Sequence, residues 1–371
     1  MPSSEPTPPA RRRRSPASRL LLACVLVLAG GLAAEFAVRS YDLLTGHGFA
    51  AGRRTRPKRP PIPFRQFGEE LYTEHFGERF IVSCHGEEFP FRKPEGTLRI
   101  VAFGGSTTHN VEAWEAARTH YPLELQRRLR QRLGREDVEV INVGYSAYST
   151  AHSLIVLALH VLSWEPDVVL LSHNVNDRSA AYFPDFVPDY VHKYGHPTFL
   201  GEQAEDVGVL DALLRRSEAW AFARNLAKRW SRTPPVYGPY PDHPPEEALL
   251  TFERNLRSFV RLAREAGVDV VLGTQPMHGD PARFEAHMQH KAYNDLVVYP
   301  EPAQDRKHHA AYNAVLVRVA EEEGVGLADN AARMDDEDAY FTDHVHYTPE
   351  GIRVLTEGWF DALTARLGVL R

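Results

Sequence analysis

The chain has 371 residues, 43% of them hydrophobic and 25% charged, which is the composition of a globular protein large enough for one sizeable domain. Its net charge of −6 is unevenly spread, because residues 1–65 hold 12 Lys and Arg against 3 Asp and Glu, which leaves the remainder strongly acidic. An acidic body argues against nucleic acid as a partner, and a membrane surface explains the basic segment better.

The basic segment surrounds one long apolar stretch. Residues 1–19 are mostly Pro, Ser and Arg and are predicted to be disordered, whereas Leu20 to Val38 supplies 19 mostly apolar residues. We interpret residues 20–38 as an uncleaved transmembrane anchor, in preference to a cleaved signal peptide or a lipoprotein signal ending at Cys24. The arginines at 11–14 and 19 favour a cytoplasmic N-terminus, so the body is expected outside the cytoplasmic membrane as a single-pass protein.

Residues 39–96 are expected to form a tether and an N-terminal arm. The tether is basic and rich in proline from Gly46 to Arg65, and the arm at residues 66–96 is expected to pack on the domain that follows. The two cysteines, Cys24 and Cys84, provide neither a disulfide framework nor a Cys-x-x-Cys metal site.

From Thr97 onward, apolar runs alternate with helical patterns, which indicates a parallel sheet between two layers of helices. The expected strands are Arg99–Phe103, Val138–Val143, Asp167–Ser172, Val268–Gly273 and Gly326–Ala328. The expected helices are Tyr121–Leu133, Ala151–Leu162, Glu246–Ala266 and His309–Glu323. Residues 97–371 are therefore predicted to form a three-layer α/β domain of the flavodoxin-like type with a five-stranded parallel sheet.

Two insertions interrupt this alternation, at residues 178–245 and 276–308. The first contains a predicted helix around Leu210–Trp230. Long insertions at the carboxyl ends of the strands are where α/β enzymes place lids and specificity elements.

The first strand of the domain ends at Gly104-Gly105-Ser106, a turn that presents a hydroxyl at the edge of the sheet. Far along the chain, Asp343-His344-Val345-His346 precedes a helical segment from Thr348 to Leu367. Serine, histidine and aspartate are the components of a hydroxyl nucleophile, its base and the group that orients the base. The alternative for Ser106 is a helix N-cap.

Four separated blocks make the sequence resemble the SGNH (GDSL-type) hydrolase family. The nucleophile block has the form Gly-Gly-Ser-Thr, the third block carries Asn174 where glycine is usual, and the last has the spacing Asp-x-x-His. In chain order the four blocks are Gly104–Thr108, Asn142–Ser146, Asn174–Asp177 and Asp343–His346.

The resemblance implies a bacterial serine hydrolase in which Ser106 is the nucleophile, His346 the base and Asp343 the residue that holds the base. The backbone N–H groups of Ser106 and Gly144 and the side-chain amide of Asn176 would form the oxyanion hole. Asn174 would either narrow the pocket or add a donor.

The remaining histidines have no role in this scheme. His344 is expected to be a surface histidine or one that only supports the site. Solvated loop positions, rather than zinc ligation, are expected for His287, His290, His308 and His309, because their spacing matches no recognised metal motif.

The expected function is hydrolysis of acyl esters outside the cytoplasmic membrane, with short acyl groups such as acetyl on carbohydrate as the first choice of substrate. No cofactor is expected, since the sequence contains no phosphate-binding or dinucleotide-binding fingerprint. The alternatives are a lysophospholipase or thioesterase, an O-acyltransferase and, outside the enzymes, a carbohydrate-binding module on an inactive hydrolase fold.

Overall fold

The computed structural model describes residues 16–45, 61–62, 64–196, 199, 214, 217–230, 233–289, 291 and 293–368. The chain divides into two compact units. The first consists of Met1–Lys58 and Glu205–Ser231, and the second of Arg59–Ala204 and Arg232–Arg371.

The first unit contains two helices that contact each other, α1 (Pro16–Leu44) and α10 (Glu218–Trp230). Within α1, the segment Ala23–Leu44 has a mean hydropathy of 1.6 and is long and apolar enough to cross a membrane. The helix begins at Pro16, inside the segment predicted to be disordered. The rest of that segment, residues 1–15, and the tether at 46–60 lie outside the described residues.

The second unit is built on a five-stranded parallel sheet with the strand order β12-β10-β8-β6-β7. The strands are β6 (Leu98–Gly104), β7 (Val138–Asn142), β8 (Val168–Ser172), β10 (Asp269–Gly273) and β12 (Gly326–Ala328). Numbered along the chain this order is 2-1-3-4-5 when read from β7, which is the flavodoxin-like arrangement. The predicted fold class is confirmed, and each predicted strand is present.

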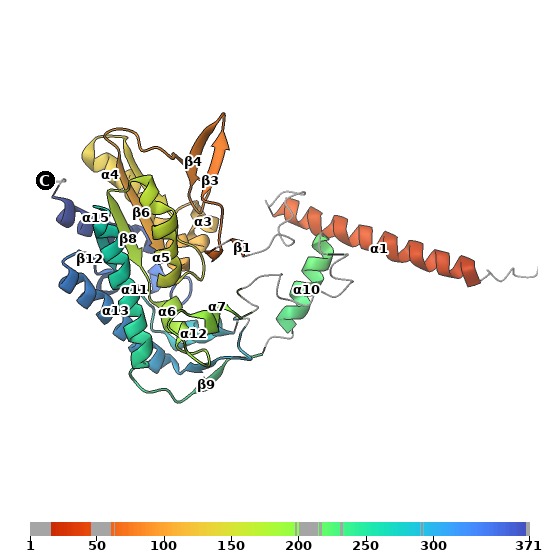
Figure 1. Cartoon of the computed structure of the whole chain (residues 1–371). Coiled ribbons are helices and arrows are strands. Elements are labelled where there is room, and N and C mark those ends of the chain that lie inside the picture. Colours follow the sequence, from red (N-terminus) through yellow and green to blue (C-terminus); the bar gives the residue numbers. More distant parts are fainter. Residues whose placement is uncertain are drawn as a thin grey trace, which may run out of the picture. The chain divides into compact units, whose positions relative to one another are not determined.

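Helices cover both faces of the sheet (Figure 1). Along β6, Val101 and Phe103 pack on one face while Ile100 and Ala102 pack on the other, because successive side chains of a strand point in opposite directions. The first face is covered by α5 (Thr150–Leu159), α11 (Glu246–Glu265) and α13 (Pro302–Glu323). The second face is covered by α4 (Tyr121–Leu133) and α15 (Pro349–Leu367).

The N-terminal arm packs on this domain. It contains the antiparallel pair β1 (Pro61–Ile62) and β2 (Gln66–Phe67) and an antiparallel sheet of β3 (Tyr72–His75), β4 (Glu78–Val82) and β5 (Glu88–Pro90). The buried guanidinium of Arg99 on β6 donates to the carbonyl of Pro90 at 2.8 Å and pairs with Glu139 on β7. Phe67 is fully buried, so the arm contributes to the core.

The two insertions are joined by a parallel pair of short strands, β9 (Val236–Gly238) and β11 (Val298–Pro300). The first insertion also contains α7 (Val191–Tyr194), and the second contains α12 (Pro281–Met288). The shorter elements near the carboxyl edge of the sheet are α2 (Ser106–His109), α3 (Val111–Ala117), α6 (Val175–Ala180), α14 (Asn330–Met334) and the single-turn 3-10 helix η3 (Asp338–Tyr340). A second 3-10 helix, η1 (Val161–Trp164), lies between α5 and β8 at the amino edge, where the carbonyl of Trp164 accepts from Arg99.

Candidate active site

The turn between β6 and α2 places Ser106 at the carboxyl edge of the sheet. Gly105 is the N-cap of α2 and Ser106 is its first residue, so the serine hydroxyl does not cap the helix. A Cβ atom on Gly105 would lie 2.4 Å from Nδ2 of Asn176, so only glycine fits between the serine and that amide.

Ser106 stands at one end of an unbroken chain of hydrogen bonds. Its Oγ lies 2.8 Å from Nε2 of His346, and Nδ1 of His346 lies 2.7 Å from Oδ2 of Asp343. The other carboxylate oxygen accepts the backbone N–H groups of Val345 and His346 at 2.8 and 2.9 Å. The turn just before α15 thus holds the Asp343 carboxylate against the His346 imidazole. The fold brings this turn to Ser106, although His346 and Ser106 are 240 residues apart in the sequence.

The surroundings of these hydrogen-bonded groups favour an ionised Asp343 carboxylate beside a basic His346 imidazole. Burial alone would raise the pKa of Asp343, but hydrogen bonds from His287 and His346 hold it well below its usual range. Burial opposes protonation of His346, yet its hydrogen bond to Asp343 and the negative charges of Asp343 and Glu112 outweigh this, so the pKa of His346 is raised. The Glu112 carboxylate, on α3, lies 3.9 Å from Nδ1 of His346.

His287 is a part of the site that the sequence did not reveal. Its Nδ1 lies 2.9 Å from Oδ2 of Asp343, the oxygen that also bonds to His346. Burial and the charge of Lys291 lower the pKa of His287 to about 4, so its ring is neutral at neutral pH and donates its Nδ1 proton. The predicted solvated loop position is wrong for this residue, because α12 carries it onto the carboxylate.

The expectations for the other histidines also need correction, with His290 lying outside the described residues. His344 is fully buried against Phe284 and His287, which rules out the surface alternative and leaves that of a histidine supporting the site. His308 and His309 are buried as well, because α13 begins at Pro302 and includes both.

The amide of Asn176 lies beside the nucleophile turn and is held there by several contacts. Its Nδ2 donates to the carbonyl of Tyr148 at 2.8 Å, and the backbone carbonyl of Asn176 accepts from Nζ of Lys193 at 2.7 Å. The buried carboxylate of Asp177 accepts the N–H of Thr150 and the hydroxyl of Tyr190. The sequence block Asn176-Asp177 therefore combines an amide near the serine with a carboxylate that ties α6 to the start of α5.

Gly144 does not offer a free donor in this structure, because its N–H donates to Oδ1 of Asn142 at 2.9 Å. Residues 144–150 are all described, and each of their backbone N–H groups has a partner except that of Ala147. Ala147 has a φ of 70°, a left-handed conformation that is unusual for alanine and is often found at functional sites. It directly precedes Tyr148, whose carbonyl holds Asn176.

Asn174 neither narrows the site nor adds a donor to it. Its amide points toward α13 and donates to the carbonyl of His309 and to Oδ1 of Asn313, both at 2.9 Å. Gln275, which follows β10, links α2 to α6. Its Nε2 donates to Oγ1 of Thr107 and its Oε1 accepts the N–H of Val175, each at 2.8 Å. These contacts lock the nucleophile helix and the Asn176 helix to the same strand end.

Comparison with known proteins decides the family. Residues 102–354 match the family model described as GDSL-like lipase/acylhydrolase, which covers more than half of the chain. The chain belongs to the GDSL-like lipase/acylhydrolase family. It is therefore an SGNH-type hydrolase, as the sequence blocks predicted. No curated protein matches the chain.

Solved structures similar to this GDSL-like hydrolase share low identity with it. A lipase/acylhydrolase from Enterococcus faecalis has 18% identity and a TM-score of 0.42, with 72% of this chain and 96% of that chain covered. A variant of an acetyl xylan esterase from Geobacillus stearothermophilus has 15% identity and a TM-score of 0.43, covering 73% and 96%. A GDSL-like lipase from Bacteroides thetaiotaomicron has 14% identity and a TM-score of 0.40, covering 72% and 88%.

Two groups of side chains in the described part of this hydrolase are close enough to hold a metal ion. They are Cys84 with His85 and His109, and His287 with Asp343 and His344. In the first group, a ring nitrogen of His85 bonds to the carbonyl of His109, and one of His109 bonds to Ser146. In the second, Asp343 is already bonded to two histidines. In the described part of the chain, however, both ring nitrogens of His344 are buried without a hydrogen-bond partner, so protein groups do not satisfy every member of the second group.

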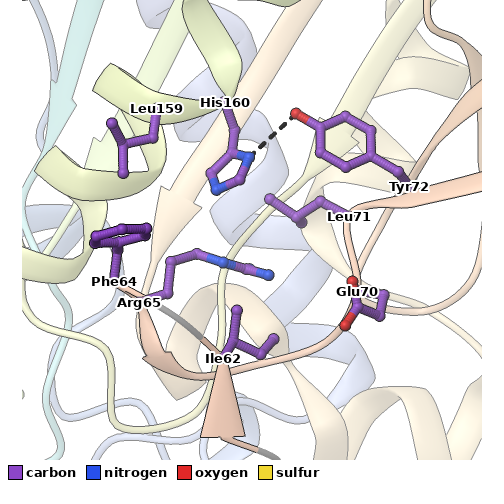
Figure 2. Close-up of a pocket in the computed structure, with 8 residues that line it drawn as sticks. All are labelled: Ile62, Phe64, Arg65, Glu70, Leu71, Tyr72, Leu159 and His160. Carbon is purple, nitrogen blue, oxygen red and sulfur yellow. Dashed lines mark hydrogen bonds between the residues drawn. The ribbon is translucent and has the colours of Figure 1, made fainter.

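A cavity of about 350 Å³ lies between the N-terminal arm and the end of α5 (Figure 2). Nδ1 of His160 lies 3.1 Å from the Tyr72 hydroxyl at its rim. The lining residues are Ile62, Phe64, Arg65, Glu70, Leu71, Tyr72, Leu159 and His160. Because α5 starts beside the catalytic edge at Thr150 and ends at this cavity, the cavity is separate from the serine site.

Proposed function

We propose that this GDSL-like hydrolase cleaves acyl esters through an acyl intermediate on Ser106. The observation that carries the proposal is the hydrogen-bond chain from Ser106 through His346 to Asp343. His346 accepts the hydroxyl proton as Ser106 attacks the ester carbonyl, then donates it to the leaving alcohol. Water, activated by the same imidazole, releases the acid, while Asp343 stabilises the imidazolium.

The oxyanion formed in each step would be stabilised by three donors. The N–H of Ser106 is available because the first residue of a helix has no intrahelical acceptor. The second donor is a backbone N–H of the loop after β7: either Gly144, as the sequence block predicts, on release of its bond to Asn142, or Ala147, whose N–H has no partner among the described residues. The third is the amide of Asn176, which uses only one of its two hydrogens on Tyr148.

The nucleophile assignment is tested with Ser106→Ala, which should abolish esterase activity and leave the fold unchanged because only one hydroxyl is lost. A fluorophosphonate probe should label the wild-type chain at Ser106, and mass spectrometry of the labelled peptide would locate it. Labelling at Ser146 or Ser172 would contradict the assignment.

The substrate class we propose is a short acyl ester, such as an acetyl group on an extracytoplasmic carbohydrate. It is supported by family membership and by the membrane-spanning length of α1. A panel of p-nitrophenyl esters from acetyl to palmitoyl tests the chain length. Preference for long chains would favour a lysophospholipase, and transfer of the acyl group to an added sugar would favour an O-acyltransferase.

We also propose that α1 is an uncleaved anchor with the catalytic unit outside the cytoplasmic membrane. Alkaline phosphatase fused after Arg371 should then be active in a bacterial host, whereas activity of a cytoplasmic reporter at the same point would contradict the topology. A mature chain beginning near Ala34 would indicate a cleaved signal instead. A truncated catalytic chain should begin before Phe67, because Phe67 of the arm belongs to the core.

A further inference from the structure

Glu35 is a charged residue in the apolar helix α1, and its carboxylate is hydrogen-bonded to the start of α10. Its oxygens accept hydrogen bonds from the hydroxyl of Ser217 at 2.7 Å and from the backbone N–H groups of Glu218 and Ala219 at 3.1 and 3.0 Å. Arg39 on the same helix adds an ion pair at 2.8 Å. The two backbone N–H groups have no acceptor within α10, because they lie in its first turn, where the helix dipole also favours a negative charge.

Several apolar side chains among the described residues of this unit lie on its surface. Along α1, Leu28 is 67% exposed and Leu32 is 72% exposed, as suits a helix surrounded by lipid. On α10, Glu218 and Ala221 are buried, whereas Phe222 is 46% exposed and Leu226 36%. Phe222 and Leu226 are one helical turn apart and therefore share a face.

The depth of Glu35 in the apolar stretch suits an interfacial helix. Glu35 lies three positions before Val38, the last residue of the predicted anchor at 20–38, and this corresponds to about 4.5 Å along a helix. Amphipathic helices in a membrane interface bury their apolar face by about 5–10 Å. A helix whose first turn is bonded to Glu35 would therefore start at the level where such helices lie.

We propose that α10 is a second membrane-binding element, which lies in the interface of the bilayer with Phe222 and Leu226 toward the acyl chains. Its partner is the phospholipid surface on the side of the membrane where we propose that the catalytic unit lies. Glu35 joins it to the anchor, which explains a carboxylate at a membrane boundary that would otherwise be costly. The proposal goes beyond ester hydrolysis and rests on α1 spanning the membrane, as proposed above.

The position of α10 in the sequence connects this membrane contact to the serine site. It belongs to the insertion that starts at Arg178, two residues after Asn176, and α7 of the same insertion supplies Lys193, which donates to the backbone carbonyl of Asn176. The segment that supports the proposed oxyanion donor therefore continues into a helix that binds the membrane surface.

The test uses the full chain in nanodiscs of phosphatidylcholine and phosphatidylglycerol, with Cys24 and Cys84 replaced by alanine. A bimane fluorophore is attached to a single cysteine introduced as Leu226→Cys, Leu28→Cys or Leu250→Cys. Leu250 is the matched control, because it is 57% exposed on α11 of the catalytic unit. Quenching by nitroxide-labelled lipid is compared with quenching by aqueous iodide, and turnover of p-nitrophenyl acetate shows that each labelled chain is folded.

We expect lipid quenching to be several-fold stronger at Leu226 and Leu28 than at Leu250, with iodide giving the opposite order. Glu35→Ala should reduce lipid quenching at Leu226 and leave it unchanged at Leu28, because α1 becomes more apolar while α10 loses its cap. If Leu226 behaves like Leu250 while Leu28 is quenched by lipid, the interfacial helix is refuted and the anchor stands. If Leu28 is also quenched only by iodide, both proposals fail.

Discussion

Nδ1 of His287 lies 2.9 Å from Oδ2 of Asp343, so one carboxylate oxygen accepts hydrogen bonds from two histidines. His346 bonds to the proposed nucleophile, whereas His287 comes from α12 in the second insertion. The insertion therefore contributes directly to the position of Asp343, the aspartate of the proposed triad.

His287→Ala should lower kcat, because Asp343 loses one of its fixed donors. A hydrogen bond to a charged group is worth about 1.5–3 kcal/mol, which corresponds to roughly a ten- to hundredfold loss if it is fully needed in the transition state. His287→Gln, which can still donate an N–H, should recover part of the rate. Equal kcat values for both variants and the wild type would show that His287 does not position Asp343.

Replacing His346 should mainly reduce activity, whereas replacing His344 should mainly reduce stability. His346→Ala should reduce kcat/KM by a factor on the order of 10³ or more, as removal of a triad member does. His344→Ala should keep most of the activity but lower the free energy of unfolding by about 1–3 kcal/mol, because its ring is fully buried. Denaturant titration and ester turnover measure the two effects, and reversed outcomes would mean that the base is misassigned.

The rate should rise with pH through the titration of His346, because only the neutral imidazole accepts the serine proton. Its pKa is raised above the ordinary 6.5, so the acidic limb of kcat/KM should have its midpoint above that value. Glu112→Gln removes a negative charge that favours the imidazolium, so the midpoint should move to lower pH. Glu115→Gln, on the exposed side of the same helix, is the control and should leave the midpoint unchanged.

Ala147→Gly should stabilise the protein and retain kcat. A left-handed conformation costs a non-glycine residue about 1–2 kcal/mol, partly offset by the extra backbone entropy of glycine, so a gain of up to about 1 kcal/mol is expected. Ala320→Gly, in the interior of α13, should instead destabilise by about 1 kcal/mol. Thermal or denaturant unfolding tests both, and a loss of stability for Ala147→Gly would contradict the strained loop.

Asn176→Ala and Asn174→Ala should differ in kind. Loss of an oxyanion donor costs about 10²–10³ in kcat, so Asn176→Ala should be slow but well folded. Asn174 instead bonds to α13, so Asn174→Ala should mainly lower stability. Steady-state kinetics beside unfolding curves distinguish the two, and a normal kcat for Asn176→Ala would remove the amide from the proposed mechanism.

The sequence by itself determined the sheet, its order of elements and the four blocks around Ser106, Asn176 and His346. These features are local: continuous apolar runs mark buried parallel strands, and the rule that such strands share a carboxyl edge brings their following residues together. The spacing of Asp343 and His346 is also local, because one turn of backbone holds both.

Only the tertiary structure decided which more distant groups complete the site. His287 reaches Asp343 because α12 packs there, and the N–H of Gly144 is occupied because the Asn142 side chain folds back onto it. The pairing of Glu35 with the start of α10 joins residues more than 180 positions apart. Such contacts depend on packing and on the satisfaction of individual donors, which periodicity and residue type along the chain do not encode.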